Sequence, residues 1–323
     1  RPNYKELNKL KHNFGDVPVM ALTATATERV LHDVKHILGL RSCATFTASF
    51  NRPNLKYEVL AKKKACAAQI AEMLKKKHPG KTGIVYCCSK KDCETVAQEL
   101  SKQGLKAAHY HADLDILARR EVQEQWMSDE VNVICATIAF GMGINKPDVR
   151  FVVHHSLPKS LEGYMQETGR AGRDGADAGC YLYYTYGDKS KIDAMIWKGE
   201  GDERTKAQQR QQLMGVVSYA EDEFSCRRAL MLQYFGEAFD RKRCRGTCDI
   251  CRGKRGSQKR DMSGLARSAL SLLDSGGRMT VGQMVDVLKG ANNQSTKQKG
   301  FNRLPGFGAA NDLKKAEVDR VVK

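Results

Sequence analysis

Runs of consecutive apolar residues alternate with amphipathic segments through the middle of the chain. Between about residues 54 and 196, these runs predict strands at Gly83–Cys87, Ala107–Tyr110, Val131–Ala136, Phe151–His154 and Cys180–Tyr184. The segments Lys90–Gln103 and Leu117–Met127 have helical spacing. Near-continuous apolar strands separated by helices are typical of a parallel sheet covered on both faces. We therefore predict one complete α/β lobe in this region.

The two ends of the chain have different patterns. Residues 1 to about 53 contain one apolar strand, Val17–Leu22, and a helix at about Thr27–Leu38. From about residue 261, the pattern predicts short helices at Leu265–Leu273, Val281–Lys289 and Asp312–Val322. Three helices at this spacing suggest a helix-turn-helix of winged type. Because no strand pair follows the third helix, we expect the wing itself to be missing.

Four cysteines lie between the lobe and these last helices, at Cys226, Cys244, Cys248 and Cys251. Three clustered thiolates, completed by a fourth from a helix that begins at Cys226, can supply the ligands of a tetrahedral structural zinc. No histidine follows His155, so the site would be all-cysteine. The alternative is four ordinary buried cysteines, but two of them lie in a charged, glycine-containing loop where we do not expect burial.

Charge and cysteine usage narrow the class of protein. The 323 residues carry a net charge of +17, which favours a polyanionic partner because neutralised phosphates release counterions; a merely basic protein is the alternative. The eleven cysteines are odd in number and scattered, which is typical of a reducing compartment. No apolar run is long enough to cross a membrane, and no signal peptide is visible.

Basic residues concentrate around the cysteines. Residues 241–260 contain nine Lys or Arg and one acidic residue, which indicates a DNA-backbone contact that includes Arg243 and Arg245. A solvated run of charges is the alternative.

The most informative stretch runs from Ile134 to Gly175. It contains an apolar strand, a glycine-rich turn, a second strand and a helix that ends in two arginines, Arg170 and Arg173. Arginine is always charged and presents a rigid fork of donors, so this pair can stabilise a transferring phosphoryl group. A solvated basic turn is the alternative for the short arginine motif alone.

This stretch, AFGMGINKPDVRFV followed by QETGRAGRDG, closely resembles motifs V and VI of superfamily 2 helicases in the form found in the RecQ family of DNA helicases. The resemblance runs from Pro2 to about Val322. It implies a remnant of a first RecA-like lobe at 1–53 and a second RecA-like lobe at 54–196. A zinc-binding subdomain at 197–260 and a partial winged-helix domain at 261–323 would follow.

The resemblance also implies an activity and roles for residues. The parent protein would be an ATP-dependent DNA helicase, moving 3′ to 5′ on single strands in replication, recombination or repair. Arg173 would be the arginine finger, Arg170 would help to hold the γ-phosphate, and Gln166 would link the nucleotide to the lobe interface. The residues beside ATP and Mg²⁺ would be Gly141, Gly143 and Asn145. RecQ members commonly have Asp where this chain has Asn145, and Gly where it has Asp113.

Four hydroxyl side chains have implied roles with ordinary structural alternatives. Thr23 and Thr25, in a stretch similar to motif III, would couple the nucleotide state to lobe movement, although such a Thr often only caps a helix. Ser89, in a stretch similar to motif IV, and Thr137 end equivalent strands and would contact the phosphates of one DNA strand. An N-cap role is the alternative for Ser89.

A Walker A loop is absent from the sequence. The segment Gly80–Thr82 has the Gly-Lys-Thr order but has Lys75 where the first glycine is required, and no Asp-Glu pair ends an apolar strand. We therefore expect half of the ATP site upstream of Arg1. The chain alone should bind DNA (single strands and duplex junctions) and zinc without hydrolysing ATP, in the nucleus of a eukaryote or otherwise in the cytoplasm. A non-enzymatic DNA-binding or adaptor module and a superfamily 2 RNA helicase are the alternatives.

Overall fold

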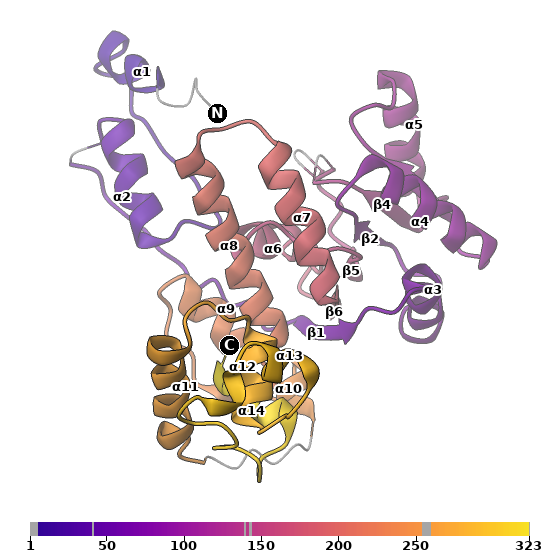
Figure 1. The fold of residues 1–323 in the computed structure, drawn as a ribbon. Coiled ribbons are helices and arrows are strands. Elements are labelled where there is room, and N and C mark those ends of the chain that lie inside the picture. The colour runs from indigo at the N-terminus through magenta and orange to yellow at the C-terminus, as the bar shows by residue number, and fades with distance from the viewer. Residues whose placement is uncertain (1–5, 41, 139, 142–143, 254–259, 323) are drawn as a thin grey trace. The chain divides into compact units, whose positions relative to one another are not determined.

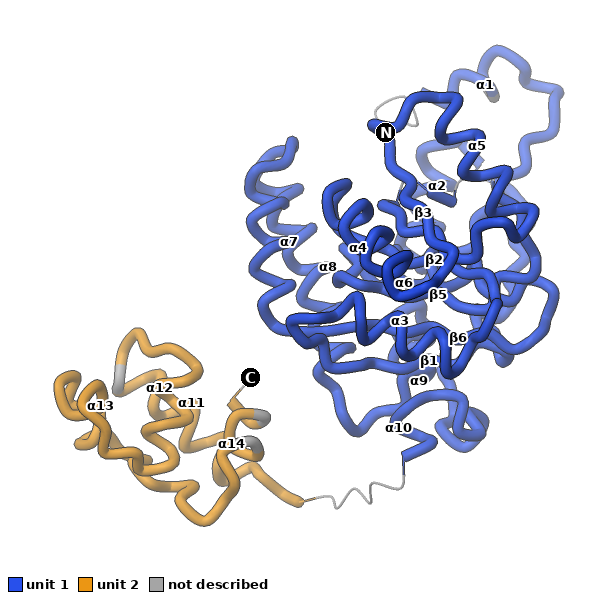
Figure 2. Tube along the Cα trace, turned by 90° about the vertical axis from the view of Figure 1, so that its right-hand side faces the viewer, with its two compact units in different colours: residues 1–255 blue, residues 256–323 orange. Residues whose placement is uncertain are grey.

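The computed structural model describes residues 6–40, 42–138, 140–141, 144–253 and 260–322. The chain divides into two compact units, residues 1–255 and 256–323 (Figure 2). Among the described residues, no helix combines the length and the apolar character that spanning a bilayer requires.

A six-stranded parallel sheet forms the centre of the first unit (Figure 1). Its strands lie in the order β1-β6-β5-β2-β4-β3. Their bounds are β1 Leu55–Ala61, β2 Gly83–Tyr86, β3 Ala107–Tyr110, β4 Val133–Ala136, β5 Phe151–His154 and β6 Ala178–Tyr184. The five predicted strands are confirmed to within two residues at each end, and β1 is an additional strand that we did not predict.

Helices cover both faces of this sheet, as predicted. One apolar cluster joins Val85 and Val153 to helices α3 and α4, and the other joins Ile84 and Val152 to helices α5 to α9. The helices of the first unit are α1 Asn8–Asn13, α2 Glu28–Ile37, α3 Cys66–Lys77, α4 Lys90–Lys102, α5 Ile116–Met127, α6 Leu161–Thr168, α7 Tyr186–Lys198, α8 Glu203–Glu221, α9 Arg227–Tyr234 and α10 Asp249–Arg252, with a 3₁₀ turn η2 at Arg241–Cys244.

The predicted strand at Val17–Leu22 is wrong. These residues have no strand pairing, and the side chains of Met20 and Leu22 are 81% and 86% exposed. A strand is stable only when a neighbour accepts its backbone hydrogen bonds, and no described strand lies beside this segment. The predicted helix after it is confirmed as α2, and Thr27 caps it by accepting a hydrogen bond from the Val30 N–H.

The second unit is a small helical domain with its own core. Its elements are α11 Ser263–Gly276, α12 Val281–Leu288, α13 Gln294–Gln298, η3 Phe301–Arg303 and α14 Lys315–Val322. Residues from three of these helices, Leu272, Val287 and Val318, are fully buried together. The three predicted helices are confirmed, and α13 is an additional helix. The described residues 260–322 contain no strand.

Candidate nucleotide site and metal centre

The loop that follows β4 is anchored in the core where it begins. The Tyr86 hydroxyl donates a hydrogen bond to the Phe140 carbonyl oxygen over 3.2 Å, and burial raises the pKa of Tyr86, so its proton stays in place. The Phe140 ring packs edge-on against Tyr110 and Trp126, with ring centroids 4.7 and 5.3 Å apart. The start of the loop is therefore fixed relative to the sheet.

A buried lysine fixes the far end of the same loop. The Lys146 side chain is only 5% exposed, and its ammonium lies 3.0 Å from Asp129 and 3.3 Å from Asp148. It also donates to the Met127 carbonyl oxygen at the end of α5. Since a buried ammonium needs such partners, this cation holds the loop against the helix.

Arg170 and Arg173 both contact this loop. Arg170 donates to the Gly141 carbonyl oxygen. Arg173 donates to the Ile144 carbonyl oxygen over 2.9 Å and reaches the Asn145 side-chain oxygen at 3.4 Å. The structure thus brings together the two arginines, Gly141 and Asn145. Gly143 falls outside the described residues.

Gly141 is required by the position of Arg170. Its φ of +133° is unusual for a residue with a side chain, and a Cβ atom built there would overlap the Arg170 guanidinium. The Arg170 Nε is buried without a described hydrogen-bond partner. A side chain at position 141 would therefore displace the Arg170 guanidinium.

Helix α6 places the two arginines and Gln166. Its N-terminus is capped by Ser160, and the buried pair His154–Glu167, with Nε2 and Oε2 2.6 Å apart, ties it to β5. Gln166 is exposed on this helix. Thr23 and Thr25 contact each other, since the Thr25 N–H donates to the Thr23 hydroxyl, and no described hydrogen bond joins them to the loop after β4.

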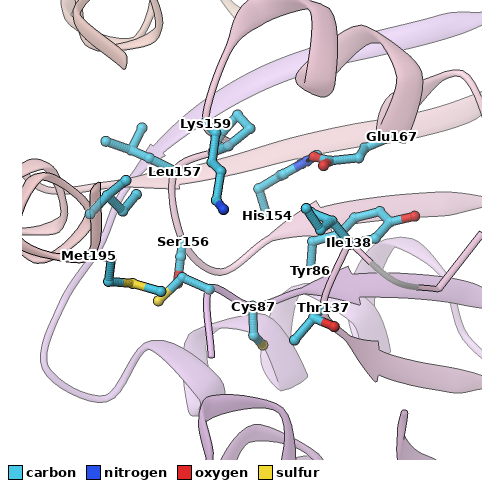
Figure 3. Close-up of a pocket in the computed structure, with 13 residues that line it drawn as sticks. Tyr86, Cys87, Thr137, Ile138, His154, Ser156, Leu157, Lys159, Glu167 and Met195 are labelled. Carbon is cyan, nitrogen blue, oxygen red and sulfur yellow. Dashed lines mark hydrogen bonds and ion pairs between the residues drawn. The ribbon is translucent and has the colours of Figure 1, made fainter. Parts of the chain in front are cut away.

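A pocket with about 70 Å³ of space open to water lies where β2, β4 and β5 end (Figure 3). Thr137 lines it, and Figure 3 shows the Lys159 ammonium pointing into it. Ser89 does not line this pocket; its hydroxyl caps α4 by accepting a hydrogen bond from the Asp92 N–H at 3.1 Å. The N-cap alternative that the sequence left open is thus the contact that Ser89 makes.

The four predicted cysteine ligands meet in one cluster. Cys226 precedes α9, Cys244 ends η2, and Cys248 and Cys251 belong to the turn around α10. All four sulfur atoms lie within 4.8 Å of one another, and the Cys244–Cys248 and Cys226–Cys248 distances are 3.7 and 3.9 Å. Zinc bonds of about 2.3 Å to tetrahedral sulfurs require sulfur atoms about 3.8 Å apart. The four side chains therefore fit a zinc ion.

The cluster is more buried than the sequence suggested. We did not expect burial for Cys248 in its charged loop, but it is completely buried, beside Tyr57 of β1 and in the same apolar cluster as Met231 of α9. Its interaction with the Cys226 side chain, together with nearby backbone N–H groups, lowers the pKa of Cys248. This favours the thiolate, which is the form that binds zinc.

Basic side chains stand on the outside of the cluster. Arg243 and Arg245 are both exposed, and the Arg243 guanidinium lies over the Phe239 ring, 5.6 Å from its centroid. Part of the predicted basic run, residues 254–259, falls outside the described residues.

The cysteine module also holds the edge of the sheet. The Tyr57 N–H of β1 donates to the Thr247 carbonyl oxygen over 3.0 Å, and the Val59 N–H donates to the Asp249 carboxylate over 3.0 Å. Asp249 in turn pairs with the buried Arg227, at 3.0 Å. The module and the lobe are therefore joined through β1.

Arg52 and Arg228, which the sequence did not single out, connect this module to the segment Arg170–Arg173. Arg228 is 3% exposed and donates to the carbonyl oxygens of Arg52 and Leu55, both over 2.7 Å. The Arg52 guanidinium reaches the carbonyl oxygens beside Arg170 and Arg173. The sequence shows Arg227 and Arg228 directly after Cys226, but their burial, which marks them as partnered, appears only in the structure.

Comparisons with known proteins cover both units. The helicase conserved C-terminal domain matches residues 63–175, the RecQ zinc-binding domain matches residues 186–252, and the RQC domain matches residues 256–323. The zinc-binding match contains all four clustered cysteines.

Curated relatives align along the whole chain. The chain is 44% identical to ATP-dependent DNA helicase Q-like 4B of Arabidopsis thaliana, covering 100% of this chain and 29% of the relative. It is 44% identical to ATP-dependent DNA helicase hus2/rqh1 of Schizosaccharomyces pombe (99% and 24%) and 42% identical to RecQ-like DNA helicase BLM of Xenopus laevis (100% and 25%). The chain thus spans about a quarter of the length of these relatives.

Proposed function

This chain belongs to the RecQ family of helicases, and we propose that it supplies the second motor lobe, the zinc module and a DNA-binding domain of an ATP-dependent DNA helicase. ATP and Mg²⁺ would bind between this lobe and a partner lobe that carries a Walker A loop. Hydrolysis would drive movement 3′ to 5′ along single-stranded DNA.

One observation carries the proposal: Arg170 and Arg173 contact the same loop at the carboxyl ends of the parallel strands. Ligands of open parallel sheets bind beyond these strand ends. Two fixed cations in this place can stabilise the charge that develops on a transferring phosphoryl group. Arg173 is the more exposed, so we propose it as the finger and Arg170 as a γ-phosphate contact. Gln166, Gly141 and Asn145 would complete this side of the site.

The DNA contacts that we propose lie on two parts of the first unit. Thr137 and Lys159 offer a hydroxyl and an ammonium at the strand ends, where one DNA strand would pass. Arg243 and Arg245 would contact phosphates beside the zinc module. Ser89 would contact a DNA phosphate as well, through its backbone or hydroxyl group, while its hydroxyl continues to cap α4. The net charge of +17 and the RQC match support a nucleic-acid partner.

Structural zinc follows from the fit of the four sulfurs and from the matched zinc-binding domain. We propose that its role is structural because four thiolates leave no open coordination position.

We also propose domain boundaries at residues 53, 196 and 260, and a role for Thr23 and Thr25 in coupling the nucleotide state to lobe movement. The curated relatives named above come from eukaryotes, which supports a nuclear location.

The test measures ATP hydrolysis and strand separation by the full-length protein that contains this chain. We expect single-stranded DNA to stimulate hydrolysis, and a DNA duplex with a 3′ single-stranded tail to be unwound. A matched RNA duplex and a duplex with a 5′ tail are the controls. Unwinding of RNA alone would support the RNA-helicase alternative, and DNA binding without any hydrolysis would support the adaptor alternative.

A further inference from the structure

A second group of metal-ligating side chains lies outside the cysteine cluster. Glu94, His109 and His111 each offer a ligand atom, and these atoms all lie within 4.8 Å of one another. The group stands at the end of β3, an edge strand of the sheet, under the first turns of α4. Neither the nucleotide site nor the zinc module uses these residues.

The backbone explains why the three side chains converge. His109 belongs to β3 and His111 directly follows it, and residues two apart on an extended chain project to the same side. The two imidazole rings stack, with centroids 5.4 Å apart. Helix α4 packs against β3 and brings Glu94 to the same place, with its carboxylate 3.1 Å from the His111 Nε2.

His111 has an unpartnered nitrogen in a buried position. The residue is 4% exposed, and its Nδ1 has no described hydrogen-bond partner. Because the other ring nitrogen faces a carboxylate, the neutral imidazole would carry its proton on Nε2 and leave a lone pair on Nδ1. A buried polar atom without a partner costs free energy, so a metal ion bound at Nδ1 would satisfy this nitrogen while Nε2 keeps its proton toward Glu94.

The group is open to solvent on one side. The Glu94 side chain is 47% exposed, and His109 is partly exposed, whereas His111 forms the floor. An ion can therefore reach the three ligands without unfolding of the lobe. Lys90 lies nearby, but Asp113 pairs with it at 2.5 Å, which reduces its repulsion of a cation.

We propose that Glu94, His109 and His111 bind a divalent metal ion of the first transition row, and we use Zn²⁺ as the test ion. Two imidazoles and one carboxylate are a ligand set that Zn²⁺ accepts in proteins, with water in the remaining position. Imidazole ligands also suit Co²⁺ and Ni²⁺. The ion ties the first turns of α4 to the carboxyl end of β3, close to the helix cap at Ser89.

The test compares metal content and stability in variants of the whole chain. Wild-type protein is equilibrated with Zn²⁺ at a buffered micromolar free concentration, freed of loosely bound ion, and measured by mass spectrometry of the metal. We expect one equivalent more than the cysteine cluster binds. Glu94→Gln and His109→Ala should each lose that equivalent and keep the cysteine-bound one. His32→Asn, which changes an exposed histidine elsewhere, is the matched control.

Cobalt separates the two sites spectroscopically. Co²⁺ bound by four thiolates gives strong sulfur-to-metal charge-transfer absorption, whereas Co²⁺ bound by nitrogen and oxygen does not. We expect Glu94→Gln to remove only the weaker signal. In protein whose cysteine cluster is already filled with Zn²⁺, added Co²⁺ should raise the melting temperature of wild type but not of this variant. A wild-type protein that holds only the cysteine-bound equivalent, or variants that keep the second ion, would overturn the proposal.

Discussion

The Arg52 guanidinium donates a hydrogen bond to the Gly172 carbonyl oxygen over 2.6 Å, and it reaches the carbonyl oxygen of Ala171 at 3.2 Å. These carbonyls lie between the two arginines of the proposed nucleotide site. Arg228, which follows the first cysteine ligand, holds the Arg52 carbonyl oxygen in turn. The four-cysteine cluster and the segment Arg170–Arg173 are therefore linked through Arg52, which belongs to neither.

Arg52→Ala should weaken the fold and slow ATP hydrolysis in the full-length protein. Hydrogen bonds that involve a charged group contribute about 1.5–3 kcal/mol each, so we expect the free energy of unfolding to fall by about 2–4 kcal/mol. The rate of hydrolysis should fall by at least about tenfold, because displacing the arginines needs to raise the activation free energy by only about 1.4 kcal/mol for that effect. Lys56→Ala, which removes an exposed ion pair with Asp177, is the control. Unchanged hydrolysis in a destabilised Arg52 variant would limit Arg52 to a structural role.

Arg173→Ala should abolish hydrolysis without affecting stability. An arginine finger contributes a factor of about 10³ to 10⁵ in rate, whereas an exposed side chain usually changes stability by about 0.5 kcal/mol. The measurements are steady-state hydrolysis and the melting temperature of the full-length protein. Arg120→Ala, at an exposed helical ion pair, is the control. Residual hydrolysis near the wild-type rate would show that Arg173 is not the finger.

Gly141→Ala should reproduce the loss caused by Arg170→Ala. An added methyl group would overlap the Arg170 guanidinium, and the backbone φ of +133° disfavours any side chain. We expect hydrolysis to fall in both variants and not to fall further when they are combined. Gly215→Ala is the matched control, because it lies in α8 with open space around it and should be neutral or stabilising by about 0.4–1 kcal/mol. Additive losses would indicate that the glycine acts independently of Arg170.

Cys248→Ser should remove the cysteine-bound zinc and unfold the module. Structural zinc contributes about 10–16 kcal/mol in small domains, compared with a total stability of about 5–15 kcal/mol for a typical protein. We expect lower zinc content, a lower soluble yield and weaker DNA binding. Cys43→Ser, at an exposed cysteine outside the cluster, should change none of these. A Cys248 variant with full yield and normal DNA binding would contradict the structural role.

Two partly buried histidines, His78 and His155, should make the fold less stable in mild acid. Burial lowers the pKa of both His78 and His155 to about 4, compared with about 6.5 in an unfolded chain. Between these values the unfolded state binds more protons, so the free energy of unfolding should decrease as the pH falls from about 6.5 to about 4. The pKa of Asp92 is lowered to about 2, so its contribution is lost only below this window.

Urea unfolding near neutrality and at about pH 5 measures this dependence. Loss of zinc also weakens the fold in acid, so His155→Gln is compared with wild type under the same conditions. The variant should show a smaller decrease in stability between the two pH values. An identical decrease would exclude His155 as a contributor.

The sheet could be predicted where its strands are buried on both faces. Strands β2, β4 and β5 are continuous apolar runs with every residue buried, so their pattern is unambiguous. Strand β1, with the sequence LKYEVLA, lies at an edge of the sheet and is buried only at Leu55 and Tyr57, and it was not predicted. The segment Val17–Leu22 is apolar, but no strand lies beside it in the described part of the chain, so its apolar pattern led to a wrong prediction.

The candidate site could be predicted only in part. The motif around Arg170 and Arg173 and the spacing of the four cysteines are local signals, and the structure brings each group together. The contacts of Arg52 and Arg228 join residues 120 and 176 positions apart, which no local pattern records. The role of Asp113 was equally invisible, because its pairing with Lys90 depends on how α4 packs on β3.

The hydrogen bonds between the cysteine module and β1 also affect whether the edge of the sheet can pair with another molecule. An edge strand exposes backbone N–H groups that can pair with a strand of another molecule, and soluble proteins normally cover them. Here the Tyr57 and Val59 N–H groups are covered by Thr247 and Asp249, on either side of a metal ligand. A zinc ion that holds Cys248 in place would therefore keep both N–H groups covered, and we expect the metal-free protein to self-associate through β1.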